Sequence, residues 1–289
     1  MASIRDIKRR KESIESTRQI TNAMKLVATV KLQRAGARAE KAQAYFNKMY
    51  ETVQSVLASS EKMDHPYLTA NGSERKAVIV VTSNRGLAGG YNSNVARLVS
   101  DRSWKKEDLD LYGVGRKGAD ILARKGYSVV SGDADMMDEP TFAGAADLGE
   151  KVLDAFLAGQ VGEIWLAYTR FKNTVSHIPT MIRLLPVEAK QSDAAGEEDR
   201  GGRLLMNYEP GEEEVLDLLI PQYVNSMIYG ALIEAAASEN AARMQAMDSA
   251  TGNAGEMIEE LSLIYNRVRQ GAITQELTEI ISGAEALNN

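Results

Sequence analysis

The spacing of apolar residues predicts a long helix at the start of the chain. From Ile4 to Val56, mostly apolar side chains recur at alternating steps of three and four residues, a spacing that places them on one face of a helix. Twelve of the sixteen positions in this row are apolar, and no proline precedes Pro66. A row of this length predicts one coiled-coil helix of about 57 residues. Ser3 and Asp6 have the spacing of a capping box and mark its start.

The last third of the chain repeats this helical pattern. Between Ile233 and Ala272, ten of twelve positions at the same spacing are apolar. Pro221 predicts a kink or a new helix start shortly before this row. Two helices that leave one domain in opposite chain directions pack side by side only when they are antiparallel. We therefore expect the two ends of the chain to form a long antiparallel coiled coil.

The middle of the chain has the period of strands that alternate with helices. Strands are predicted at 77–82, 109–115, 127–130 and 163–171, and helices at VARLVSD, RKGADILARKG and LGEKVLDAFLAG. This alternation predicts a mainly parallel sheet, and HIPTMIRLLPVE, with two prolines, predicts an edge strand. The expected fold class is α/β, with a Rossmann-like domain inserted into the coiled coil. The expected boundaries are 1–62, 70–210 and 211–289.

Composition removes several classes of functional site. The chain of 289 residues has no cysteine, which excludes disulfides, cysteine metal sites and thiol catalysis. Its two histidines, His65 and His177, are too few for a histidine-rich metal site, and both are predicted to be surface or loop residues. We expect no catalytic residue, no metal and no cofactor. The chain also lacks a long apolar run and a secretory signal, so we expect it in the cytosol, or at a membrane only through partners.

Charge is distributed unevenly along a chain whose net charge is −6. Residues 1–41 contain eleven Lys and Arg against four Asp and Glu, whereas residues 188–217 contain ten acidic and three basic residues. The basic residues of the N-terminal segment are spread around the predicted helix without interleaved aromatic residues. This distribution argues against nucleic-acid binding. We expect the acidic segment 193–199 to be a solvated loop.

A glycine-rich turn follows the first predicted strand and raises the question of nucleotide binding. The segment SNRGLAGGYNSN (83–94) has no Lys followed by Ser or Thr, and its glycines at 86, 89 and 90 do not match G-x-G-x-x-G. A phosphate loop also needs consecutive backbone N–H groups that face the anion. We therefore expect these glycines to tighten the turn and let the following helix pack on the sheet.

Three stretches of the sequence resemble the γ subunit of F-type ATP synthase. They are IRDIKRRKESIESTRQITNAMKLVATVKLQRA, SNRGLAGGYNSNV and ASENAARMQAMDSATGNAGEMIEELSLIYNRVRQGAITQELTEIISGAEAL. The resemblance implies a non-catalytic rotor of the central stalk. Its coiled coil would turn inside a hexamer of α and β subunits and couple ion flow through a membrane ring to ATP synthesis or hydrolysis on the β subunits.

The same resemblance implies contacts with named partners. An acidic lever of a β subunit would contact Met24, Lys25 and Arg243. A catch loop would contact Arg269, Gln270, Thr274 and Glu276. The polar loops of the membrane ring would contact Tyr208 and Glu209. The α/β domain would dock an ε subunit, and the complex would lie on the cytoplasmic face of a bacterial cell membrane. If Met24 and Arg243 lie at one height, the numbers of any two residues that face each other across the antiparallel helices add to 267. Residues beyond about 266 then have no partner on the N-terminal helix.

Two alternatives remain open from the residues. A coiled-coil adaptor also needs long helices, but it would not restore rotation-coupled ATPase activity to α and β subunits. A nucleotide-dependent α/β enzyme with helical arms would bind ATP in isolation, which a rotor shaft would not do tightly.

Overall fold

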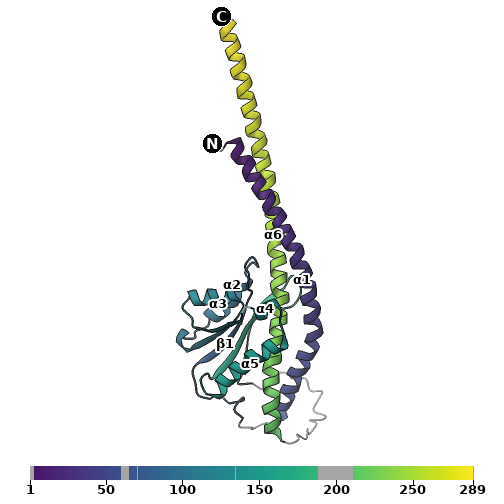
Figure 1. The fold of residues 1–289 in the computed structure, drawn as a ribbon, viewed down its shortest axis with the longest axis vertical. Coiled ribbons are helices and arrows are strands. Elements are labelled where there is room, and N and C mark those ends of the chain that lie inside the picture. Colours follow the sequence, from purple (N-terminus) through teal and green to yellow (C-terminus); the bar gives the residue numbers. More distant parts are fainter. Residues whose placement is uncertain (1–2, 60–64, 70, 134, 188–210, 289) are drawn as a thin grey trace, which may run out of the picture. The chain divides into compact units, whose positions relative to one another are not determined.

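The computed structural model describes residues 3–59, 65–69, 71–133, 135–187 and 211–288. Helix α1 (Ile4–Ser59) has 56 residues, and helix α6 (Glu212–Asn288) has 77 residues (Figure 1). The elements between them are β1 (Lys76–Val81), α2 (Tyr91–Ser100), η1 (Lys106–Asp108), β2 (Leu109–Val114), α3 (Arg116–Arg124), β3 (Val129–Asp133), α4 (Asp135–Asp138), α5 (Phe142–Leu157), β4 (Glu163–Phe171) and β5 (His177–Leu185). The predicted fold class, an α/β sheet with long terminal helices, is confirmed.

The chain forms two compact units. One contains residues 1–28 and 243–289, and the other contains residues 29–242. The division falls within both α1 and α6, each of which is a continuous helix. None of the helices, over the residues that the structure describes, carries an apolar stretch long enough to cross a membrane.

The unit of residues 29–242 contains a five-stranded sheet with the order β3-β2-β1-β4-β5. Strand β1 pairs in parallel with β2 and with β4, and β2 pairs in parallel with β3. Strand β5 pairs antiparallel with β4 and lies at the edge, where Pro179 is tolerated. The predicted parallel sheet with a proline-bearing edge strand is therefore confirmed.

Helices cover both faces of this sheet (Figure 1). On one face, Val78 and Val80 of β1 pack with residues of α2 and α3, including Val95 and Leu122. On the other face, Ile79 packs in a cluster that α5, α1 and α6 share. Because β1 is buried on both faces, its sequence is a continuous apolar run with no polar alternation.

The two long helices begin and continue for identifiable reasons. Ser3 and Asp6 form the predicted capping box, in which the Asp6 N–H donates to Ser3 Oγ (3.2 Å) and the Ser3 N–H donates to Asp6 Oδ2 (3.1 Å). The predicted new helix start at Pro221 is wrong, because α6 is helical on both sides of this residue. Ile220 and Val224, which flank it, are fully buried, and their packing offsets the cost of about 3 kcal/mol for a proline inside a helix.

Within the unit of residues 1–28 and 243–289, α1 and α6 are antiparallel, as predicted. The hydroxyl oxygens of Thr21 and Thr251 lie 2.8 Å apart, and Lys25 Nζ lies 2.6 Å from Asp248 Oδ1. The numbers of the facing residues therefore add to 272 and 273. The predicted sum of 267 is wrong, because it displaces the pairing by five to six residues, which is more than one helical turn. An apolar seam alone allows several alignments, whereas polar pairs across the seam select one.

The observed register also shows where α6 loses its neighbour within this unit. With facing numbers that add to about 272, Ile4 at the start of α1 lies opposite Val268. Val268 is half-buried, and every residue from 269 to 284 is exposed. The unpartnered segment thus begins at Arg269, close to the position predicted from the sequence.

A pair of engineered cysteines can test the register. In Thr21→Cys/Thr251→Cys the two side chains replace hydroxyls in direct contact, so a disulfide should form in nearly all molecules under mild oxidation. Thr21→Cys/Ala246→Cys, which matches the sum of 267, is the control and should remain reduced. Because the natural chain has no cysteine, thiol titration measures the outcome directly. Faster oxidation of the control pair would show that the register is wrong.

Candidate functional site

The carboxyl ends of β1 and β4 define the first place to look for a ligand site. Strand β1 has β2 on one side and β4 on the other, so the strand order reverses between β1 and β4. In open α/β sheets, ligands bind in the crevice at such a switch point. The glycine-rich turn lies there, because it joins the end of β1 to the start of α2.

Polar side chains of this turn bond to the chain itself. The Ser83 N–H donates to Asn92 Oδ1 at 2.9 Å, and the Ser83 hydroxyl donates to the carbonyl of Arg85 at 2.6 Å. Asn84 Oδ1 accepts from the backbone N–H of Arg116 at 3.3 Å. The serine and the two asparagines therefore hold the turn against the next loop, a structural use of residues that could otherwise face a phosphate.

Helix α6 covers the turn that follows β1. Ala88 and Tyr91 are buried in a small cluster with Ala242 of α6. The Tyr91 hydroxyl donates a hydrogen bond to the carbonyl of Ala235 on the same helix, at 3.2 Å. The helix thus contacts the turn at the position where a nucleotide would lie in a ligand-binding relative of this fold.

Helix α6 also bonds to the end of β4. The Ser238 hydroxyl donates to the Thr169 carbonyl at 3.1 Å, and Glu234 Oε2 accepts from the Phe171 N–H at 3.3 Å. Together with the Tyr91 bond, these contacts join α6 to the end of β4 and to the start of α2, which follows the turn after β1. The chain fills its own crevice with a helix.

Burial at this edge shifts two pKa values. Desolvation raises the pKa of Glu234, although its hydrogen bond from the Phe171 N–H and the charge of Arg170 act in the opposite direction. Desolvation, with a further contribution from the negative charge of Glu234, raises the pKa of Tyr168 to about 12. Glu234 is therefore a poorly solvated carboxyl group with a structural partner.

The glycines that permit close packing are only partly those that the sequence indicated. Gly89 has φ +56° and does turn the chain, but a Cβ at Gly86 would meet open space. The close approach lies in the second loop, where Gly115 has φ +86° and a Cβ would lie 2.0 Å from the Thr82 carbonyl oxygen. The segment GVGRKG (113–118), which begins in β2, carries the sequence signal for this close approach.

The prediction that each histidine is a surface or loop residue holds for His65, which lies in a loop, and is wrong for His177, which lies in a strand. His65 lies in a loop but is fully buried, with Nδ1 accepting from the Tyr67 N–H (3.3 Å) and Nε2 3.3 Å from Asp217 Oδ1 on α6. His177 is half-buried at the start of strand β5, where burial lowers its pKa. No group of three or more His, Asp or Glu side chains within the described ranges is placed to hold a metal ion.

The residues predicted to contact partners fall into three groups. Met24, Lys25 and Arg243 are half-buried on the long helices, and Lys25 forms the ion pair with Asp248. Exposed residues of the unpartnered end of α6 make up the second group: Arg269, Gln270, Thr274 and Glu276. Tyr208 and Glu209 lie outside the described residues.

The sheet, the long helices and the contacts between them define a class of protein. It is an α/β domain inserted between two long helices, in which one helix covers the crevice that would otherwise take a ligand. Among the described residues, helix α6 thus occupies the switch point of the sheet.

Comparisons with known proteins agree with this class and extend it. The family described as ATP synthase matches residues 3–287. The ATP synthase gamma chain of Lachnoclostridium phytofermentans is 61% identical over 291 residues, which cover 100% of both chains. The sodium ion specific ATP synthase gamma chain of Acetobacterium woodii is 40% identical over 99% of both chains. A chain of the Tetrahymena thermophila mitochondrial ATP synthase central stalk and c-ring superposes with a TM-score of 0.56 at 25% identity, covering 80% of this chain and 99% of that one.

The chain belongs to the ATP synthase family, among its gamma chains. The resemblance of the three sequence stretches is thereby confirmed over nearly the whole length of the chain.

Gly115→Ala should be strongly destabilising. The added methyl group would meet the Thr82 carbonyl, and alanine is strained at φ +86°, so we expect a loss of about 3 kcal/mol in the free energy of unfolding. Gly86→Ala is the matched control, since its site is open, and should change the free energy by less than about 0.5 kcal/mol. Urea denaturation of both variants measures their free energies of unfolding. Equal losses in the two variants would contradict the close approach of the chain at Gly115.

Glu234→Gln should remove part of the pH dependence of stability. A carboxyl group whose pKa is raised by folding stabilises the native state below its unfolded pKa, and this contribution is lost as the pH rises through the folded pKa. Glutamine keeps an acceptor for the Phe171 N–H without the charge. We expect the variant to be more stable than the wild type at pH 8 and to match it near pH 4. Urea denaturation across this range is the measurement, and a variant that loses stability at pH 8 would contradict the prediction.

Proposed function

We propose that this chain is the rotating central-stalk subunit of an F-type ATP synthase. In this role its paired helices turn inside a hexamer of α and β subunits and couple ion flow through a membrane ring to ATP synthesis or hydrolysis. The β subunits carry out the chemistry, and this chain is not an enzyme. The end-to-end match to an ATP synthase gamma chain at 61% identity is the observation that carries the proposal.

The attachment of α6 to the sheet supports a mechanical role. Hydrogen bonds from Tyr91, Ser238 and the Phe171 N–H join the helix to the start of α2 and to the end of β4, and an extensive apolar cluster lies beneath it. A torque applied to the α/β domain would reach α6 through many contacts at once. This is what a shaft requires, because a domain held by a flexible linker would turn without transmitting force.

The half-buried residues Met24, Lys25 and Arg243 are proposed to meet the acidic lever of a β subunit. Beside them on α1, Ile20 and Val27 are each 58% exposed, which is unusual for neighbouring aliphatic side chains. A basic and apolar surface of this kind complements an acidic amphipathic element. Charge complementarity would set the preferred angle between the two more than the affinity.

The unpartnered end of α6 is proposed to turn in an apolar sleeve formed by the hexamer. Ile273, Leu277, Ile280 and Ile281 are each about half exposed or more, an unfavourable arrangement for a lone helix in water. Arg269, Gln270, Thr274 and Glu276 lie in the same exposed segment and are proposed to contact a catch loop.

Partners at the other end of the rotor are the membrane ring and an ε subunit. Tyr208 and Glu209 are proposed to lie near the polar loops of the ring, and the α/β domain is proposed to dock ε. The relatives in Lachnoclostridium phytofermentans and Acetobacterium woodii support a place on the cytoplasmic face of a bacterial cell membrane, held there through the complex. The second of these relatives is named as sodium ion specific.

Amide hydrogen exchange tests the proposed sleeve. In the isolated chain, residues 269–284 have no packed neighbour in the unit that contains them, so their amides should exchange at least about tenfold faster than those around Thr251. Assembly with the hexamer should slow them, while the buried amides of β1 should stay protected in both states. Strong protection of residues 269–284 in the isolated chain would count against the sleeve.

Reconstitution with α and β subunits tests the rotor function itself. With a visible probe on the α/β domain, ATP should drive unidirectional rotation, and Arg243→Glu should slow it by reversing the proposed charge match. Arg124→Gln on α3 is the control for a surface arginine and should rotate like the wild type. Binding to the hexamer without rotation would favour the coiled-coil adaptor, and tight ATP binding by the isolated chain would favour the enzyme.

A further inference from the structure

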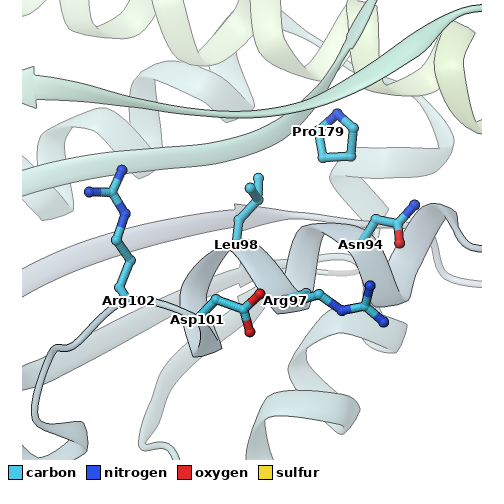
Figure 2. Close-up of a pocket in the computed structure, with 6 residues that line it drawn as sticks. All are labelled: Asn94, Arg97, Leu98, Asp101, Arg102 and Pro179. Carbon is cyan, nitrogen blue, oxygen red and sulfur yellow. The ribbon is translucent and has the colours of Figure 1, made fainter.

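A pocket lies between helix α2 and the edge strand β5. It has a volume of about 430 Å³ and is lined by Asn94, Arg97, Leu98, Asp101, Arg102 and Pro179 (Figure 2). This volume lies within the range of small-molecule sites in proteins. The pocket is on the sheet face that α2 and α3 cover, away from the crevice that α6 fills.

The ends and the middle of this pocket differ in chemistry. Figure 2 shows Leu98 pointing toward Pro179 at the centre, with Arg102 on one side and Arg97 and Asn94 on the other. Leu98 and Pro179 therefore give the pocket an apolar centre between two cationic ends. Neither guanidinium forms a hydrogen bond or ion pair with another residue in the part of the chain that the structure describes.

Aromatic rings hold the Arg102 guanidinium in place. Its central carbon lies 5.4 Å from the ring centre of Trp104 and 5.3 Å from that of Trp165, and these two rings are 5.2 Å apart. Cation–π contacts of this kind attract the guanidinium to the rings and do not use its N–H donors. Arg102 is thus oriented for an anion before any ligand binds.

The charges around the tryptophan pair favour an anion as well. Lys76 and Arg183 lie 5.8 Å and 6.0 Å from the rings of Trp104 and Trp165. Glu163 accepts from the Trp165 indole N–H at 2.6 Å and pairs with Lys76 at 2.9 Å, and these bonds lower its pKa although burial acts to raise it. With Glu163 paired to Lys76, the Arg102 guanidinium adds positive charge to the lining of the pocket.

We propose that the pocket between α2 and β5 binds a small dianion. Its short apolar body lies on Leu98 and Pro179, one oxyanionic group is bound by Arg102, and the other is bound by Arg97 and Asn94. The two groups can be carboxylates or phosphates, since a guanidinium binds both through paired N–H donors. Asp101 also lines the pocket, so its carboxylate selects against anions placed at the centre.

Calorimetric titration of the full chain with three probes tests the charge pattern. Adipate has two carboxylates on an apolar body, hexanoate has the same number of carbons with one carboxylate, and pyrophosphate has two anionic groups without an apolar body. We expect adipate to bind about fivefold more tightly than hexanoate, since it gains one exposed ion pair. Adipate should also bind more tightly than pyrophosphate, and equal binding of all three probes would overturn the proposal.

Single substitutions identify the residues that bind the probe. Arg102→Gln and Arg97→Gln should each weaken adipate binding about fivefold, and Asp101→Asn should tighten it about twofold. Arg124→Gln, an exposed arginine on α3, is the matched control and should bind like the wild type. Unchanged melting temperatures would show that the variants remain folded. Adipate affinities that are equal across all of these variants would overturn the site.

Tryptophan emission gives an independent reading at Arg102. The chain contains two tryptophans, and both contact this guanidinium, so a bound anion should shift the emission saturably. The adipate concentration that gives half of the emission shift should equal the dissociation constant measured by calorimetry, both in the wild type and in Arg97→Gln. An emission that does not respond to adipate while calorimetry shows binding would place the anion elsewhere and overturn the assignment to Arg102.

Discussion

The fold of residues 29–242 depends on a hydrophobic core that the sheet cannot complete without the long helices. Val53 of α1 and Leu216, Ile220 and Ile228 of α6 are fully buried in the same cluster as Ile79 of β1. Separating either helix from the sheet would expose side chains that each contribute about 2 kcal/mol when buried. The α/β domain and these parts of α1 and α6 therefore behave as one body, and a force on one is felt by the other.

The same dependence explains why a fold that commonly binds nucleotides has no open crevice here. Tyr91, Ser238 and Glu234 make hydrogen bonds between α6 and the carboxyl edge of the sheet, each contributing on the order of 1 kcal/mol. A ligand at this edge would have to displace the helix and break all three. The position that serves chemistry in other α/β proteins serves attachment in this one, in agreement with membership among ATP synthase gamma chains.

The sequence predicted the elements well because their signals are local. The run AVIVV predicts a strand buried on both faces, and the row from Ile4 to Val56 predicts α1 to within a few residues. The errors concern contacts between distant segments. Burial of His65 depends on Asp217, some 150 residues later, and the tight packing at Gly115 depends on the Thr82 carbonyl. The pocket between α2 and β5 brings together Leu98 and Pro179, which no local pattern connects.

The register of the two helices shows the same limit in energetic terms. A seam rich in alanine and methionine loses little apolar contact when it slides by one turn, so its pattern cannot select one alignment. Sliding would separate the Thr21 and Thr251 hydroxyls and break the Lys25–Asp248 pair, and the buried Thr21 hydroxyl would lose its partner across the seam. Thr21 and Thr251 would keep their bonds to the carbonyls of Arg18 and Met247, so sliding would cost one hydrogen bond, about 1 kcal/mol, and the exposed ion pair, at most about 1 kcal/mol. A few polar residues within an apolar seam thus fix the alignment that the apolar residues leave undetermined.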